Sequence, residues 1–179
     1  MRIVEDGSSQ PILPGCAAAA VAVLLCFAVS GVRAEDRDGG VLRWMAQGNQ
    51  IYRCSQDNGR NQWVLARPQA VLKDKDGVVK AEHGAGPTWR AGDGSEVQGV
   101  VVTTIPAPKL GAISWLVLRV SRHIGRGLLD HVAYVLRTDT DGGIAPEAGC
   151  DSSQPSREVS VPYHAIYTFI AGSNFTTAD

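Results

Sequence analysis

From Gly48 onward, short hydrophobic runs alternate with clusters of Gly, Pro, Asn and Asp. No window keeps the i, i+3, i+4, i+7 spacing of an amphipathic helix over four turns, so the pattern is that of a β-protein. Strands are predicted at residues 50–54, 62–67, 78–83, 88–91, 97–104, 113–121, 129–138 and 163–170. Between them, Asp-Gly and Asn-Gly pairs supply the positive φ angles that tight hairpins need.

Two of these strands predict how the sheet is buried. Residues 163–170 alternate, with Tyr163, Ala165, Tyr167 and Phe169 on one face, which indicates a strand buried on one side. Residues 113–118 are almost continuously apolar, which predicts a strand covered on both faces. About eight short strands predict a single-domain antiparallel β-barrel or β-sandwich, and the sequence leaves these two open.

The first 34 residues are predicted to be a secretory signal peptide, leaving residues 35–179 as one all-β domain. Residues 16–29 form a fourteen-residue apolar run, followed by small residues up to Ala34. This run is shorter than the roughly 20 residues that a membrane-spanning helix needs, so no membrane span is expected. The predicted location is therefore secreted or periplasmic.

Cys54 and Cys150 are the two cysteines that remain after removal of residues 1–34. Because thiols of exported proteins tend to oxidise, we expect them to form one disulfide. Two separately buried thiols are the alternative.

The balance of charge argues against a nucleic-acid partner. The chain carries a net charge of −1, and its basic residues are scattered instead of forming a stripe. The expected partner is an extracellular ligand or protein whose identity the sequence does not give, and neither does it give the oligomeric state.

No cofactor and no metal ion is expected from the motifs. Gly84-Ala85-Gly86 opens like a dinucleotide-binding fingerprint, but Trp89 stands at the third glycine position and no amphipathic helix follows. The histidines of the predicted domain form no metal-binding spacing, so a metal site would have to be assembled from separate strands.

The segment 83–95 holds the most chemistry in the chain. If its flanking strands pair as a hairpin, Asp93 could orient His83 as a general base. Alternatively, the imidazole bonds to backbone and the carboxylate satisfies a turn. Ser95 lacks the Gly-x-Ser-x-Gly elbow of a nucleophile, and Trp89 is the best candidate for an indole that stacks on a ligand.

Several motifs together resemble a family of secreted bacterial and fungal proteins known only as a domain of unknown function. They are QIYRC at 50–54, HGAGPTW at 83–89, DGS at 93–95, WLVL at 115–118 and VPYHAIYTF at 161–169. The similarity covers residues 42–170. It implies export, a β-rich domain and the cysteine pair, but no reaction.

The leading hypothesis is a non-catalytic secreted binding or interaction module. Its site is predicted around His83, Trp89 and Asp93, reached by Gln50, Tyr52 and Tyr163. One alternative is an extracellular hydrolase or lyase that uses His83 and Asp93. Another is an envelope or matrix protein whose surface packs against partners.

Overall fold

The fold is described from a computed structural model, which covers residues 40–57, 59–151, 153 and 156–172. The predicted signal peptide lies outside these residues. Within them, no helix has the length and apolar character needed to cross a membrane.

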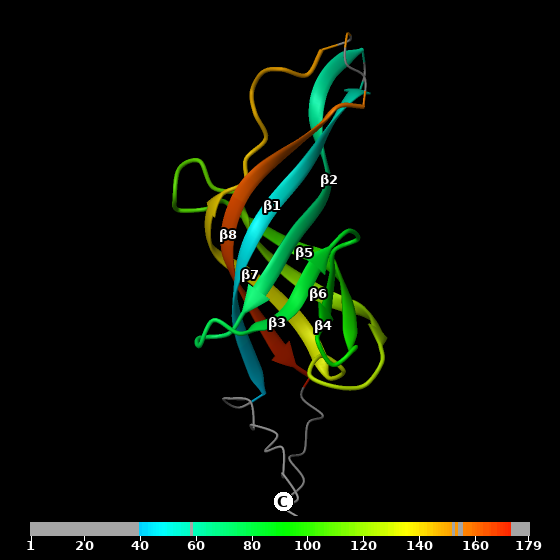
Figure 1. Cartoon of the computed structure of the whole chain (residues 1–179), viewed down its shortest axis with the longest axis vertical. Helices are drawn as coiled ribbons and strands as arrows, with labels where there is room; N and C mark the ends of the chain where they lie inside the picture. Colours follow the sequence, from blue (N-terminus) through cyan, green and yellow to red (C-terminus); the bar gives the residue numbers. More distant parts are fainter. Residues whose placement is uncertain (1–39, 58, 152, 154–155, 173–179) are drawn as a thin grey trace, which may run out of the picture. The chain divides into compact units, whose positions relative to one another are not determined.

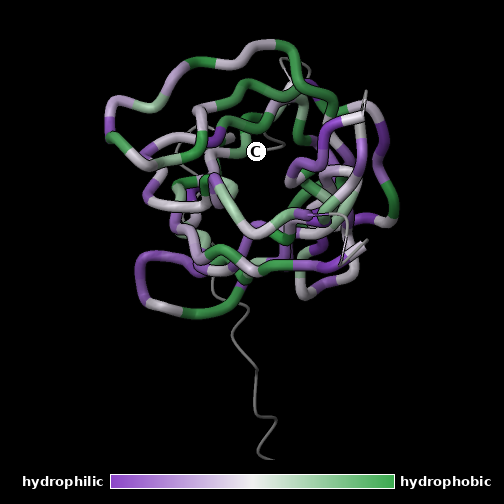
Figure 2. The backbone as a smooth tube through the Cα atoms, turned by 90° about the horizontal axis from the view of Figure 1, so that it is seen from above, coloured by the Kyte–Doolittle hydropathy of each residue, from purple (hydrophilic) through white to green (hydrophobic). Residues whose placement is uncertain are grey.

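Eight antiparallel strands, each bonded to the next along the chain, form one sheet that closes on itself (Figures 1 and 2). The strands are β1 (Val41–Asp57), β2 (Arg60–Lys73), β3 (Val79–Gly84), β4 (Thr88–Ala91), β5 (Glu96–Ile105), β6 (Trp115–Ile124), β7 (Val132–Gly142) and β8 (Glu158–Ala171). The all-β prediction is confirmed, and pairing of β8 with β1 makes the sheet a barrel.

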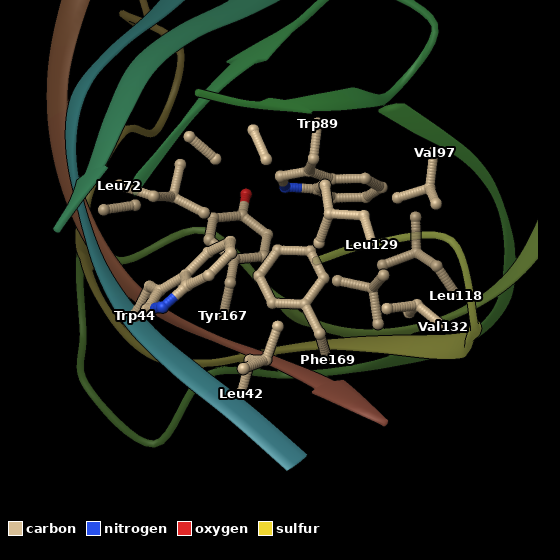
Figure 3. Close-up of a cluster of buried hydrophobic side chains, with 14 of the residues drawn as sticks. Leu42, Trp44, Leu72, Trp89, Val97, Leu118, Leu129, Val132, Tyr167 and Phe169 are labelled. Atoms are coloured by element: carbon tan, nitrogen blue, oxygen red, sulfur yellow. The ribbon is translucent and has the colours of Figure 1, made fainter. Parts of the chain in front are cut away.

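The core fills the barrel because alternate residues of each strand point inward. On β8, Tyr163, Ala165, Tyr167 and Phe169 are all buried, as their alternation predicted. Around them, Trp44 of β1 and Trp89 of β4 contribute the largest rings (Figure 3). The Trp44 and Phe169 ring centroids lie 4.9 Å apart, and those of Trp89 and Phe169 lie 6.0 Å apart.

β1 and β2 are much longer than predicted. β1 starts at Val41, where it pairs with Ile170, so residues 41–42 belong to the sheet. At the other end, β1 and β2 stay paired up to Asp57 and Arg60. The prediction at 62–67 covers most of the exposed outer half of β2, whereas the missed residues 68–73 form its inner half, in which burial alternates.

β6 differs from its prediction as a strand covered on both faces. Of its residues only Leu118 and Val120 are buried, while Trp115, Leu116 and Val117 are partly exposed. The apolar run reflects an interior that opens to solvent at this end of the barrel, not a second covering layer.

An open seam separates parts of β2 and β5. Across the described residues, β2 pairs with β3 only from Ala70 onward, and β5 pairs with β4 only up to Gln98. Residues 60–69 and 100–105 therefore each have a sheet partner on one side only, since Gly99 still donates to the Pro87 carbonyl oxygen. The short β3–β4 hairpin closes the barrel below this seam.

The Cys54–Cys150 disulfide is confirmed, with its two Cα atoms 5.2 Å apart. It ties β1 to the segment that connects β7 and β8. Trp63 of β2 holds the same segment, because its indole Nε1 donates to the Ala148 carbonyl oxygen at 3.0 Å.

Candidate functional site

The barrel interior changes from apolar to polar along β1. Leu42, Trp44 and Ala46 are followed on the inward face by Gln50 and Tyr52. The polar end is also the end at which the seam opens, so polar interior groups and an opening in the wall coincide.

A pocket of about 380 Å³ occupies this polar end, and we call it the mouth pocket. It is lined by Gln50, Tyr52, Leu65, Thr104, Ala112, Ile113, Ser114, Leu116, Arg137, Ile144 and Ala145. Small-molecule sites usually combine a mainly apolar lining with a few polar groups in a volume of this order. The mouth pocket has both properties.

Gln50 is the most unusual group of the mouth pocket. Its side chain is only 2% exposed, yet neither its Nε2 nor its Oε1 has a hydrogen-bond partner in the described structure. A buried amide without partners is destabilising, so nearly all such groups in folded proteins are bonded. Gln50 is therefore a buried group at the floor of the pocket, and its amide makes no hydrogen bond with the described residues.

Arg137 contributes a positive charge to the lining of the mouth pocket. Its Nε and Nη2 both donate to the Ser114 carbonyl oxygen, at 3.1 and 2.7 Å. Among the described residues no carboxylate pairs with its guanidinium. Arg137 is partly buried, and no carboxylate of the described residues neutralises its charge.

Tyr52 holds the wall of the pocket in place. Its hydroxyl donates to the Gly143 carbonyl oxygen at 2.7 Å, across the end of the barrel. Gly143 has φ +85°, and a Cβ there would lie 2.9 Å from Tyr163 Cβ and 3.3 Å from Gln50 Cγ. Only glycine fits this close crossing, which packs the β7–β8 segment directly against two predicted site residues.

The buried tyrosines remain neutral at physiological pH. Burial raises the pKa of Tyr163, and the neighbouring Tyr167 raises it further. Burial likewise raises the pKa of Tyr167, against the opposing charge of Arg137. The two hydroxyls and the Arg137 guanidinium lie close to one another, although within the described structure neither hydroxyl has a hydrogen bond of normal distance and angle.

His83 and Trp89 lie together inside the barrel. Their rings stack with centroids 4.7 Å apart and planes inclined by 4°, and the His83 ring contacts Tyr167 edge-on at 5.1 Å. His83 Nδ1 lies 2.8 Å from the Thr88 carbonyl oxygen, so Nδ1 carries the proton and donates. Burial lowers the pKa of His83 to about 4, so the imidazole is neutral near pH 7.

Asp93 makes its hydrogen bonds with Ser95 and Leu128 and none with His83 among the described residues. Its Oδ1 accepts from the Ser95 amide and hydroxyl at 2.9 and 2.6 Å, and its Oδ2 accepts from the Leu128 amide at 2.7 Å. Burial alone would raise the pKa of Asp93, but the hydrogen bonds from Ser95 and Leu128 lower it. Asp93 thus fixes the β6–β7 loop, which inserts the fully buried Leu129 into the core.

The structure divides the predicted site residues into three groups. Gln50 and Tyr52 line the mouth pocket, with Tyr163 packed beside Gln50. His83 and the fully buried Trp89 are core residues, and within the described chain no hydrogen bond or ion pair joins His83 to Asp93. Arg137 was missed, although it follows the buried Val135 by two residues and so shares its inward face.

A second pocket, of about 360 Å³, lies between β6 and β7 and includes His123, Asp130 and His131. His123 Nε2 contacts the Val132 carbonyl oxygen at 2.8 Å, and His131 pairs with Asp130 at 3.2 Å. In the part of the chain that the structure describes, no three His, Cys, Asp or Glu side chains are placed to hold a metal ion.

Comparison with known proteins gave one match. The sequence profile of a single protein family matches residues 37–171. No curated protein and no solved structure matches the chain.

Proposed function

Since the chain belongs to a family of proteins of unknown function (DUF3455), we propose a function from the geometry of the barrel. The protein is a non-catalytic binding module that holds a small organic ligand in the mouth pocket. The observation that carries this proposal is the Gln50 amide, buried at the pocket floor with both polar atoms unpartnered. Binding sites retain such groups because a bound ligand satisfies them, at the expense of stability in the free protein.

The replacement Gln50→Met tests this proposal. Methionine keeps the length of the side chain and removes the unbonded amide, so the free protein should become more stable by about 1–2 kcal/mol. The measurement is urea denaturation, combined with a thermal-shift screen of small organic compounds. Compounds that stabilise the wild type should stabilise the variant far less.

Gln47→Met is the matched control, because Gln47 is exposed on the outward face of the same strand. Its free energy of unfolding should stay within about 0.5 kcal/mol of the wild type, with ligand shifts unchanged. Destabilisation by Gln50→Met would mean that ordered solvent satisfies the amide. That result, or a screen without a single stabilising compound, would remove the basis of the proposal.

We propose further that the domain acts outside the cytoplasm, after cleavage behind Ala34. The disulfide and the apolar run at residues 16–29 support this location. Expression of the full chain in a host with a secretory pathway, followed by mass spectrometry, should give a mature protein that begins at Glu35. Retention of residues 1–34 in the purified protein would refute export by cleavage.

The two alternatives fit the contacts less well. A hydrolase or lyase would need Asp93 to orient His83, but the hydrogen bonds of both side chains are made with other groups. An envelope or matrix protein gives no reason for a buried amide without partners. A large assembly found by light scattering would favour the envelope or matrix protein.

A further inference from the structure

The net charge of the mouth pocket follows from its side chains. Arg137 is the only charged residue among those that line it. Tyr52, Tyr163, Tyr167 and His83 lie close enough to feel the guanidinium charge, and all of them are neutral near pH 7. The site therefore carries one positive charge, which a ligand with one negative charge would match.

Two side chains at the site keep unused hydrogen-bond donors. Ser114 engages the Nε hydrogen and one Nη2 hydrogen of Arg137, which leaves the second Nη2 hydrogen and both Nη1 hydrogens, and the Gln50 Nε2 has no partner in the described structure. A carboxylate has two oxygens and accepts hydrogen bonds only. It would take one donor from each side chain, with a charge-assisted bond to Arg137, and of the Gln50 amide it would satisfy the Nε2 and not the Oε1. A phosphate dianion would leave one negative charge unmatched.

Most of the remaining wall of the pocket is apolar. It includes Leu65 of β2 and Ile144 of the β7–β8 segment, each 49% exposed, together with Leu116 of β6. Leu65 shares an inward face with Tyr52, its partner across the β1–β2 pair, and Thr104 of β5 faces it across the seam. Apolar side chains exposed on the inner face of a barrel are ready to cover an apolar ligand.

We infer that the mouth pocket takes a monocarboxylate with an apolar body. The carboxylate binds Arg137 and Gln50, and the apolar part lies against Leu65, Leu116 and Ile144 toward the seam between β2 and β5. This inference rests on the proposed binding function and adds the class of ligand to it.

Octanoate, octanamide and octyl phosphate test the inference on the full domain, because they share one chain and differ in head group. Binding is measured by calorimetry and located by the NMR signals of the Gln50 side-chain amide, assigned by their loss in Gln50→Met. Octanoate should bind at least about tenfold more tightly than octanamide, as expected for a charged hydrogen bond. It should also bind more tightly than octyl phosphate.

Arg137→Met should remove the preference for octanoate over octanamide, whereas Arg137→Lys should keep part of it through its charge. Arg122→Met, at an exposed arginine of β6, is the matched control and should bind octanoate like the wild type. The comparison of octanoate with octanamide in the wild type needs no variant, so the inference stays testable if Arg137→Met does not fold.

The outcomes distinguish failure of the ligand class from failure of the binding function. Equal binding of octanoate and octanamide at Gln50, or tighter binding of octyl phosphate, overturns the monocarboxylate and leaves the binding function standing. If no octyl probe shifts the Gln50 signals but another compound of the screen does, the ligand class is wrong. If no compound shifts them, the inference and the proposed function fail together.

Discussion

Replacing Cys54 and Cys150 together with alanine should lower the free energy of unfolding by about 4 kcal/mol. The bond joins residues separated by 96 positions, so it removes many conformations from the unfolded chain. Native contacts would be lost as well, because the bond holds the segment after β7 against the outer ends of β1 and β2. Those ends extend beyond the main body of the barrel (Figure 1).

Urea denaturation of the double variant and the wild type, each with and without a reducing agent, measures this effect. Reductant should lower the midpoint of the wild type to that of the variant and should leave the variant unchanged. If the double variant unfolds at the wild-type midpoint, the covalent link contributes nothing, and the contacts of the segment, such as Trp63 with Ala148, hold it alone.

Acidification should weaken the fold through His83 well before the carboxylates are protonated. Burial lowers the pKa of this imidazole from 6.5 to about 4. The hydrogen bond to Thr88 acts in the opposite direction and raises the pKa, while the charge of Arg137 lowers it further. Between pH 6.5 and about 4, His83 is therefore protonated in the unfolded chain and neutral in the folded chain. Stability is fully present above pH 6.5 and should fall by about 2 kcal/mol between pH 7 and 5, and by about 3 kcal/mol at pH 4.

The comparison variant is His83→Asn, whose δ-nitrogen can donate to the Thr88 carbonyl oxygen but does not titrate. Its free energy of unfolding should be lower at pH 7 and should depend less on pH between 7 and 5. His164→Asn, at an exposed histidine of β8, should keep the wild-type pH dependence. A wild type with the same stability at pH 7 and pH 5 would show that the buried imidazole accepts a proton within the folded barrel.

The candidate site was only partly readable from the sequence, because its residues come from distant parts of the chain. Gln50, Tyr52 and Tyr163 were named in advance, and all three lie at the polar end of the barrel. Arg137 escaped notice because an arginine in a strand usually faces solvent. Its alternation with Val135 was the available signal, but the inward face of β7 is defined only once the sheet closes.

In segment 83–95, residues that are close in the sequence turn out to have separate roles. Sequence neighbours suggested that His83, Trp89 and Asp93 act together, and the β3–β4 hairpin does bring His83 opposite Trp89. Asp93, however, is bonded to Leu128, 35 residues away. Such a long-range contact leaves no local pattern, because it depends on where the β6–β7 loop returns to the barrel.

By itself, the sequence predicted about eight strands, the turns between them and the one disulfide that the two cysteines of the domain could form. Alternation and glycine-containing turns are local properties, and two cysteines allow one pair. Tertiary structure alone decided that the sheet closes into a barrel, leaving the seam between β2 and β5. Closure placed Arg137 and Gln50 in one pocket, since only pairing between the first and last strands fixes which residues share the interior.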